Sequence, residues 1–207
     1  MTAKRLRLNK NMKAIAVFCG SSKGYNSLYT TCAKELGKVF ANQNIKLVYG
    51  AGNVGLMGEI ADATLASDGK VLGVIPDFLR AKEVCHTKLT ELKVTETMHE
   101  RKAYMDDNCD GVIMLPGGFG TLDEFFEMLT WKQLHLHQKP IGIWNIDGYY
   151  DHLLKHIEHM IKEGFVKEVN LKLFVVSSDL EKLLEKMQES SFEVVGKWVD
   201  MNLENKR

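Results

Sequence analysis

What the sequence lacks excludes several classes of protein. Its 207 residues include only four cysteines with no C-x-x-C spacing, so neither a disulfide framework nor a paired-cysteine metal site is indicated. Apolar runs stay well short of the roughly 20 residues that a membrane-spanning helix needs. Neither charge predominates, because 27 basic residues balance 27 acidic ones, and no net field would recruit nucleic acid or an anionic membrane. These absences predict a cytoplasmic protein with reduced thiols that binds neither nucleic acid nor membrane.

The first 13 residues carry five basic side chains but no apolar stretch of the kind found in signal peptides. We expect residues 1–13 to form a flexible basic arm. Residues 14–207 contain no linker, repeat or low-complexity tract, so they are expected to form a single α/β domain with a substantial core.

Apolar segments alternate along the chain with segments of helical periodicity. Buried strands separated by helices indicate parallel pairing, with helices on both faces of the sheet. Asn26 is the expected N-cap of the first helix. We therefore predict a doubly wound, mainly parallel α/β fold of the Rossmann-like type. The expected strands are 14–19, 45–49, 70–75, 89–94, 111–115, 140–144 and 172–176, and the expected helices are 27–41, 56–67, 98–108, one ending near 134, 149–163 and 180–188.

Three glycine-rich turns follow the first, second and fifth of these strands, at 20–24, 50–55 and 116–120. Because ligands of doubly wound sheets bind beyond the carboxyl ends of the strands, the three turns are expected to converge on one site. The candidate ligand contacts in the first two turns are Gly20, Ser21, Gly50 and Gly52.

The third turn, Pro-Gly-Gly-Phe-Gly-Thr-Leu-Asp-Glu at 116–124, is the most informative segment. It joins an apolar strand to a segment with amphipathic helical spacing. A glycine-rich turn at such a junction exposes consecutive backbone N–H groups, and the dipole of the following helix favours an anion. The turn therefore predicts a phosphate cradle with a carboxylate, Glu124, beside it, which indicates nucleotide chemistry.

Glu124 also has a purely structural interpretation. Residues 121–124 match a capping box, in which Thr121 would be the N-cap and Glu124 would reach back to its amide. If phosphate does bind, a carboxylate about 4 Å away would be repelled by about 4 kcal/mol at an effective dielectric constant near 20. Glu124 should then point toward sugar hydroxyls or the scissile bond, and the phosphate should recruit cations. The residues alone leave both interpretations open.

Cations are available in the segment 98–105, where Arg101 and Lys102 are adjacent. The planar guanidinium of Arg101 suits phosphate or a leaving group, and Lys102 offers a point charge. A solvated, charged helix face is the alternative explanation for this pair. Glu83, in the long connection 77–88, is on its own an ordinary loop acid.

Signals for an organic cofactor are weak. Gly50, Gly52 and Gly55 satisfy G-x-G-x-x-G, but they follow the second strand, and the next strand contains no acidic ribose ligand. This position argues against a dinucleotide cofactor, and tight packing of the turn explains the glycines as well as phosphate contact does. Lys102 lies in a polar segment rather than in an apolar pocket that would suit a Schiff base with pyridoxal phosphate.

Signals for a metal are weak as well. His152, His156 and His159 share one helix face, but no H-E-x-x-H motif and no nearby cysteine pair accompany them. Surface or interface histidines explain this spacing better than zinc does. We therefore expect neither a metal nor an organic cofactor.

Together these motifs resemble the LOG ("Lonely guy") family, the cytokinin riboside 5′-monophosphate phosphoribohydrolases, long mislabelled as lysine decarboxylases. The resemblance extends from about residue 14 to about residue 188. Its most specific part is Arg101-Lys102 followed by Pro-Gly-Gly-x-Gly-Thr-x-x-Glu at 116–124. One departure is Ala51, which stands where the family usually has a third consecutive glycine. The further matching segments are 18–22, 49–52, 55–58, 98–102, 129–131, 133–134 and 147–150.

The resemblance implies a nucleotide-binding domain that hydrolyses the N-glycosidic bond of a nucleoside 5′-monophosphate, either a cytokinin riboside monophosphate or AMP. The products would be the free base and ribose 5-phosphate. Arg101 and Glu124 become the catalytic pair, and the family implies a homodimer with sites near the subunit interface. The substrate contacts that the resemblance implies are Glu83, Lys102, Gly118, Phe119, Gly120, Thr121, Leu122, Asp123 and Thr130.

Two alternatives to the hydrolase remain. Molybdenum-cofactor carrier proteins look similar in fold and also hold phosphate on glycine-rich turns, but they would retain a ligand without turning it over. An amino-acid decarboxylase would need pyridoxal phosphate. The combination of Arg101 with Glu124 in this motif favours the hydrolase.

Overall fold

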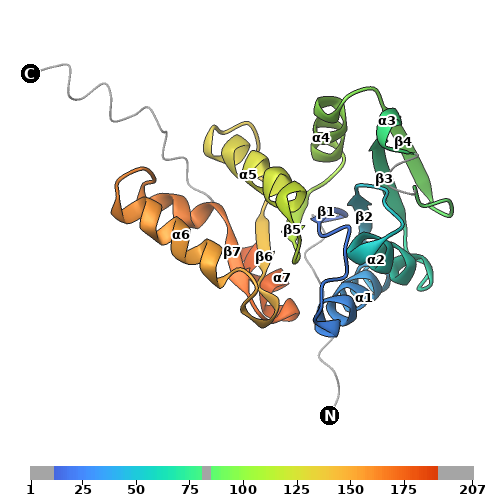
Figure 1. Cartoon of the computed structure of the whole chain (residues 1–207), viewed down its shortest axis with the longest axis horizontal. Helices are drawn as coiled ribbons and strands as arrows, with labels where there is room; N and C mark the ends of the chain where they lie inside the picture. The colour runs from blue at the N-terminus through green and yellow to red at the C-terminus, as the bar shows by residue number, and fades with distance from the viewer. Residues whose placement is uncertain (1–11, 81–84, 191–207) are drawn as a thin grey trace, which may run out of the picture.

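A computed structural model describes residues 12–80 and 85–190 of the chain. Residues 1–11, which make up most of the expected basic arm, and the candidate contact Glu83 lie outside the described residues. Strands and helices alternate in the expected order, and every strand pairing is parallel (Figure 1). The prediction of a doubly wound, Rossmann-like α/β fold is confirmed.

The described residues form a seven-stranded sheet in the order β4-β3-β2-β1-β5-β6-β7. Its central strands are apolar and buried along their length, as in β1, where all five residues are buried. Strands of this kind need cover on both faces, which parallel pairing with helical crossovers supplies. The strands are β1 (Ala14–Phe18), β2 (Lys46–Tyr49), β3 (Val71–Pro76), β4 (Glu91–Thr95), β5 (Gly111–Met114), β6 (Ile141–Trp144) and β7 (Val175–Ser177).

Helices cover both faces of the sheet (Figure 1). Three of them, α1, α2 and α7, bury side chains in one apolar cluster, and α4, α5 and α6 bury side chains in the cluster on the opposite face. The helices are α1 (Ser27–Asn42), α2 (Gly55–Leu65), the short α3 (Asp77–Arg80), α4 (Met98–Asp107), α5 (Phe119–Gln133), α6 (Asp151–Lys162) and α7 (Leu180–Glu189).

The first helix pair shows how local sequence produces this packing. Asn26 is the N-cap of α1, as predicted, and its side chain accepts a 2.9 Å hydrogen bond from the amide of Leu28. Gly37 lets α1 lie close to α2, because a β-carbon at that position would sit 2.6 Å from the carbonyl oxygen of Ile60. The helix contact is therefore a backbone-to-backbone approach that a larger residue would obstruct.

The end of the sheet differs from the prediction. The expected strand at 172–176 is displaced, since residues Glu168–Leu173 form a 3-10 helix and β7 runs only from Val175 to Ser177. Leu173 is buried in the core although it belongs to the 3-10 helix. Apolar residues of the 3-10 helix and of β7 therefore follow one another in the sequence, and their pattern resembles that of a single strand.

The strand order reverses at β1, which pairs with β2 on one side and with β5 on the other. The loops that leave the carboxyl ends of β1 and β5 consequently diverge toward opposite faces of the sheet. Doubly wound sheets bind their ligands in the crevice at such a switch point. The glycine-rich turn at 116–120 follows β5, and the turn at 20–24 follows β1.

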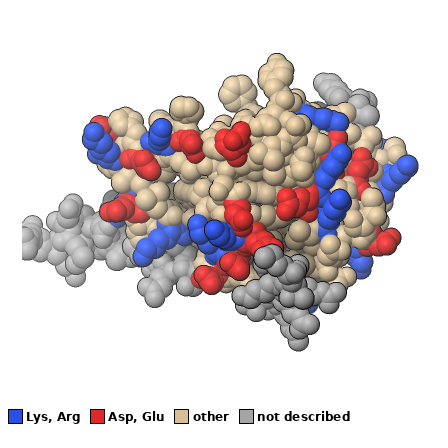
Figure 2. All heavy atoms as spheres, turned by 90° about the horizontal axis from the view of Figure 1, so that it is seen from below, with Lys and Arg blue, Asp and Glu red and all other residues tan. Residues whose placement is uncertain are grey.

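The described surface mixes charges of both signs. On the face shown in Figure 2, lysine and arginine side chains are interspersed with aspartate and glutamate rather than gathered apart from them. No helix within 12–80 or 85–190 is long and apolar enough to cross a membrane.

Candidate active site

The amino-terminal end of α5 presents backbone N–H groups for which the part of the chain that the structure describes supplies no acceptor. The helix begins at Phe119 with Gly118 as N-cap, and no side chain caps it. The amides at 119–121 belong to the first turn, where an α-helix offers them no acceptor of its own. These donors and the helix dipole together make this end suited to an anion.

The capping-box interpretation of residues 121–124 is wrong. Because α5 begins at Phe119, Thr121 lies inside the first turn and is only 4% exposed, rather than standing ahead of the helix as its N-cap. Glu124 is consequently one turn into the helix, with its side chain directed at another partner.

The partner of Glu124 is Arg101 of α4. The Arg101 Nη2 atom lies 3.1 Å from Glu124 Oε1, and the two side chains are 8% and 12% exposed. Arg101 Nε also donates a 3.1 Å hydrogen bond to the carbonyl oxygen of Val74 in β3. The guanidinium is thus anchored to the sheet through Nε and paired with the carboxylate through Nη2.

Gly50 makes room for this guanidinium. A β-carbon at Gly50 would lie 2.3 Å from Arg101 Nη2. The neighbouring Ala51 has a φ of 62°, in the left-handed region that favours glycine, so the turn keeps its shape although an alanine stands there.

A cavity of about 400 Å³ adjoins the α5 end and the Arg101–Glu124 pair. Ten of the predicted site residues line it, so turns from three strands converge as expected, while the role of each residue remains a prediction. These ten are Gly20, Ser21, Gly50, Arg101, Gly118, Phe119, Gly120, Thr121, Asp123 and Glu124.

Four predicted contacts lie outside the lining of this cavity: Gly52, Lys102, Leu122 and Thr130. Leu122 packs against the apolar core. Thr130 lies farther along α5, where its hydroxyl donates a 2.7 Å hydrogen bond to the carbonyl oxygen of Phe126. Gly52 pairs with Cys85 through an isolated β-bridge.

Lys102 joins α4 to α5 in the described structure. Its Nζ lies 2.8 Å from Asp123 Oδ2 and 3.1 Å from Glu127 Oε2. Burial lowers the pKa of Lys102, but its hydrogen bonds to the two carboxylates outweigh burial, and the pKa is raised. A protonated ammonium held in this way is unsuited to forming a Schiff base.

The G-x-G-x-x-G turn is used for packing. The carbonyl oxygen of Gly20 accepts hydrogen bonds from the amides of Leu56 and Met57, at 3.0 and 3.4 Å, and so occupies the amino-terminal donors of α2. A β-carbon at Gly55 would lie 2.2 Å from the carbonyl carbon of Ser21. This turn therefore supports the loop after β1, and its Gly50 also lines the cavity of about 400 Å³.

Sequence reasoning missed the cavity's apolar wall, which includes Cys19, Met57 and Leu79. Cys19 directly follows β1, and Met57 lies in the first turn of α2, which follows the 50–55 segment. Their positions just beyond strand ends could have marked both residues as candidates for the site. Nothing in the sequence marked Leu79. Burial and the Glu124 carboxylate raise the pKa of the Cys19 thiol, so that it stays protonated.

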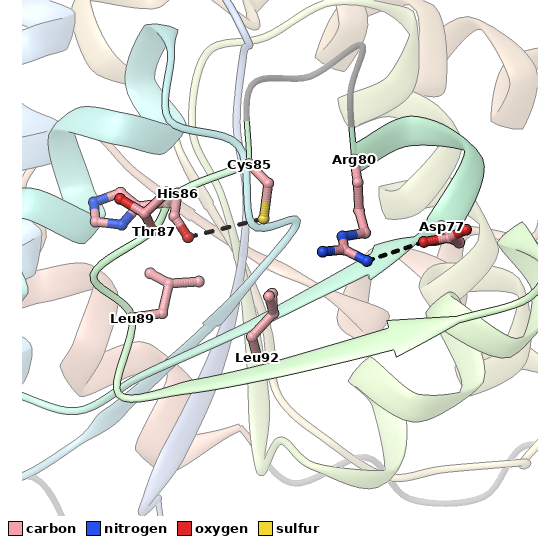
Figure 3. Close-up of a pocket in the computed structure, with 7 residues that line it drawn as sticks. All are labelled: Asp77, Arg80, Cys85, His86, Thr87, Leu89 and Leu92. Atoms are coloured by element: carbon pink, nitrogen blue, oxygen red, sulfur yellow. Dashed lines mark hydrogen bonds and ion pairs between the residues drawn. The ribbon is translucent and has the colours of Figure 1, made fainter.

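A second cavity, of about 610 Å³, lies beside β4 (Figure 3). Arg80 and Asp77 form a 3.1 Å ion pair on one wall, and the Cys85 thiol lies near the carbonyl oxygen of His86. None of the predicted site residues that fall within 12–80 and 85–190 lines this cavity. No group of three or more potential metal ligands was found within the described ranges.

A parallel sheet with an uncapped helix start at its switch point, beside an arginine–glutamate ion pair, defines a doubly wound α/β protein of the Rossmann-like type. Residues 57–187 match the family model described as "Possible lysine decarboxylase". The rice protein "Probable cytokinin riboside 5'-monophosphate phosphoribohydrolase LOGL9" (Oryza sativa subsp. japonica) is 44% identical over 177 residues, which cover 86% of this chain and 78% of the relative. "Cytokinin riboside 5'-monophosphate phosphoribohydrolase LOG1" of Arabidopsis thaliana is 40% identical over 184 residues, covering 89% and 86%. The chain belongs to this LOG family of phosphoribohydrolases.

Solved structures with the same fold include the molybdenum cofactor binding protein of Rippkaea orientalis. It has a TM-score of 0.64 and 20% sequence identity, over 87% of this chain and 98% of that one. The Moco carrier protein of Chlamydomonas reinhardtii has a TM-score of 0.60 and 19% identity, over 84% and 98%. At these identities the likeness concerns the fold.

Proposed function

We propose that this protein hydrolyses the N-glycosidic bond of a nucleoside 5′-monophosphate and releases the free base and ribose 5-phosphate. The observation that carries the proposal is the buried ion pair between Arg101 and Glu124, adjoining a cavity that the uncapped start of α5 also lines. The activity named for the relatives agrees with this arrangement.

The 5′-phosphate binds at the α5 amino terminus. Amides at 119–121 donate to its oxygens, and the helix dipole adds a favourable field. Apart from their chain neighbours and the adjoining helix backbone, no protein atom lies within 4 Å of where a β-carbon of Gly118 or Gly120 would be, so their faces are open to a ligand. Binding energy from the phosphate then positions the bond that breaks.

Glu124 acts on the ribose. Cleavage of an N-glycoside develops positive charge on the sugar, as in other oxocarbenium-like transition states. The carboxylate stabilises that charge and orients, or deprotonates, the attacking water. Arg101 fixes the carboxylate and is placed to polarise the departing base or to bind the phosphate.

The base occupies the apolar wall formed by Met57, Leu79 and Met98. Flexible thioethers fill irregular space, so they suit a planar adenine and also a prenylated one. Comparing AMP with isopentenyladenosine monophosphate as substrates measures which base is preferred.

The decisive experiment measures base release from both nucleotides by the parent protein and by Glu124→Gln. Loss of the carboxylate charge is expected to lower kcat by about 100-fold or more, the usual size of an acid–base contribution. Glu127→Gln is the matched control, since Glu127 lies one turn farther along α5 outside the cavity lining and leaves Lys102 its bond to Asp123.

A folded Glu124→Gln protein that cleaves AMP at the parent rate would overturn this mechanism. If the parent protein releases no base from either nucleotide yet retains a phosphate-bearing pterin, the carrier alternative holds instead.

We further propose a cytoplasmic homodimer. Its thiols accord with that location, as all four cysteines are free of disulfides. Large apolar side chains are exposed at both ends of α5, namely Phe119, Leu134 and Leu136, which supports placing this helix against a second copy. Light scattering should give twice the 23.4 kDa chain mass, and a monomer mass at micromolar concentration would contradict the assembly.

A further inference from the structure

Four consecutive carbonyl oxygens lead from β5 into α5, and protein donors occupy every one of them. Two of the donors are tyrosine hydroxyls, although both tyrosines come from the distant connection between β6 and α6. The bonds run from Tyr150 Oη to the oxygen of Leu115 (2.6 Å), from the Gly20 amide to Pro116 (3.0 Å), from Tyr149 Oη to Gly117 (2.7 Å) and from the Leu122 amide to Gly118 (3.1 Å).

The direction of a carbonyl determines the direction of the next amide. A trans peptide unit is planar, and its C=O and N–H point to opposite sides. The described chain contains no cis peptide bond. By holding the carbonyl of Gly117, the hydroxyl of Tyr149 therefore sets the direction of the Gly118 N–H, which points away from Tyr149.

The same bond removes an unfavourable charge. A carbonyl oxygen that turned toward the cradle would place its negative dipole end against a phosphate. A loop of Pro116, Gly117 and Gly118 includes two residues without a β-carbon, so little in the loop itself prevents such a peptide flip. The tyrosine hydroxyls supply the restraint that the loop's own side chains do not.

The tyrosines are held firmly by their surroundings. The Asn145 side chain accepts a 2.8 Å hydrogen bond from the Tyr150 amide and donates a 2.7 Å bond to Asp151. The rings of Tyr149 and Tyr150 meet edge to face with centroids 4.8 Å apart, and Tyr29 packs on Tyr149 at 5.6 Å. Burial raises the pKa of Tyr150, so its hydroxyl remains a donor.

Tyr149 does not line the cavity that contains Arg101 and Glu124. It borders a separate cavity of about 240 Å³ together with Tyr29, and Gly117 and Gly118 also line that cavity. Any influence of its hydroxyl on the substrate must therefore pass through the loop.

We propose that Tyr149 is a positioning residue whose hydroxyl sets the affinity of the cradle for the 5′-phosphate by fixing the Gly117–Gly118 peptide. The substrate class rests on the function proposed above, but the effect on phosphate binding can be measured without turnover.

The test is Tyr149→Phe, which removes one oxygen and keeps the ring packing. We expect KM for AMP to rise about tenfold with kcat within about twofold, and the Kd of ribose 5-phosphate, measured by calorimetry, to rise by the same factor. Binding of adenosine, which has no phosphate, should stay unchanged. Tyr29→Phe is the matched control, because its hydroxyl makes no hydrogen bond with the described residues although its ring belongs to the same stack.

An unchanged Kd for ribose 5-phosphate in Tyr149→Phe would overturn the proposal, and so would an equal loss for adenosine or an equal effect of Tyr29→Phe. A parent protein that binds ribose 5-phosphate but releases no base would count against the hydrolase alone, since the calorimetric comparison would still decide the role of Tyr149.

Discussion

At the scale of single residues, Gly117 ahead of α5 and Gly120 in its first turn differ in why a glycine suits the position. A β-carbon at Gly117 would lie 2.1 Å from Thr121 Oγ1 and 2.9 Å from the amide nitrogen of Gly20. At Gly120, which lines the cavity, it would meet no atom within 4 Å beyond the chain neighbours and the helix's own backbone. Gly117 is therefore constrained by the protein, whereas Gly120 leaves space that a ligand can occupy.

This difference predicts opposite outcomes for two alanine variants. Gly120→Ala should keep or raise the melting temperature, because alanine is a better helix former than glycine by about 1 kcal/mol. It should also weaken ribose 5-phosphate binding roughly tenfold, or about 1.4 kcal/mol, because the methyl group enters the cradle.

Gly117→Ala is the contrasting variant. Its melting temperature should fall, because the added methyl group would clash with the Thr121 side chain. Calorimetry and thermal unfolding of both variants measure the two effects. Unimpaired ligand binding by Gly120→Ala would show that the open space beside it is not the phosphate site.

At the scale of secondary-structure elements, the contact between α1 and α2 depends on Gly37. Alanine at this position gains helix propensity of about 1 kcal/mol, but its β-carbon would press on the backbone of Ile60 and on Thr64. Overpacking of a close contact typically costs 1–3 kcal/mol. We expect Gly37→Ala to lower the free energy of unfolding by about 1 kcal/mol, measured by urea denaturation. Gly120→Ala serves as the reference for a glycine that has space beside it. A Gly37→Ala protein as stable as the parent, or more stable, would show that the contact between α1 and α2 does not depend on this glycine.

Elements defined by local patterns could be predicted from the sequence. Asn26 begins α1 as expected, because N-capping involves only the next few amides. The start of α5 could not be predicted in the same way, since Thr121 and Glu124 satisfy a local capping rule that the structure does not use. The helix begins at Phe119 instead, and the carboxylate of Glu124 pairs with Arg101, more than twenty positions away in the sequence.

At the scale of the whole molecule, the order of strands assembles the site. The turn at 116–120 and the turn at 20–24 become neighbours because β1 and β5 pair, and Gly20 bonds directly to Pro116. The rule that ligands bind at a switch point predicted this convergence from the sequence. The contributions of Leu79 and Tyr149 could not be predicted, because they depend on how distant connections pack around the loop.

The stability of the whole molecule should also depend on pH through one buried lysine. Lys132 of α5 is 2% exposed, and burial lowers its pKa from 10.5 to about 8. Below pH 8 both the folded and the unfolded chains carry the proton, so the cost of burying the charge is fully present. Between pH 8 and pH 10.5 the folded protein releases the proton first, and the contribution of Lys132 to stability rises with pH.

Buried cysteines act in the opposite direction over the same range; burial raises the pKa of Cys109, for example, from 9.0 to about 11. The effect of Lys132 is therefore measured as a difference between the parent protein and Lys132→Met. At pH 7 the variant should be more stable by roughly 1–3 kcal/mol, the cost of a buried polar group without a hydrogen-bond partner. Within 12–80 and 85–190 the Lys132 side chain makes no hydrogen bond or ion pair. That advantage should shrink as the pH approaches 10.5. Lys162→Met, at an exposed position of α6, is the control and should show no such trend. If the stability difference between the parent protein and Lys132→Met does not change with pH, the Lys132 ammonium is not buried in the folded protein.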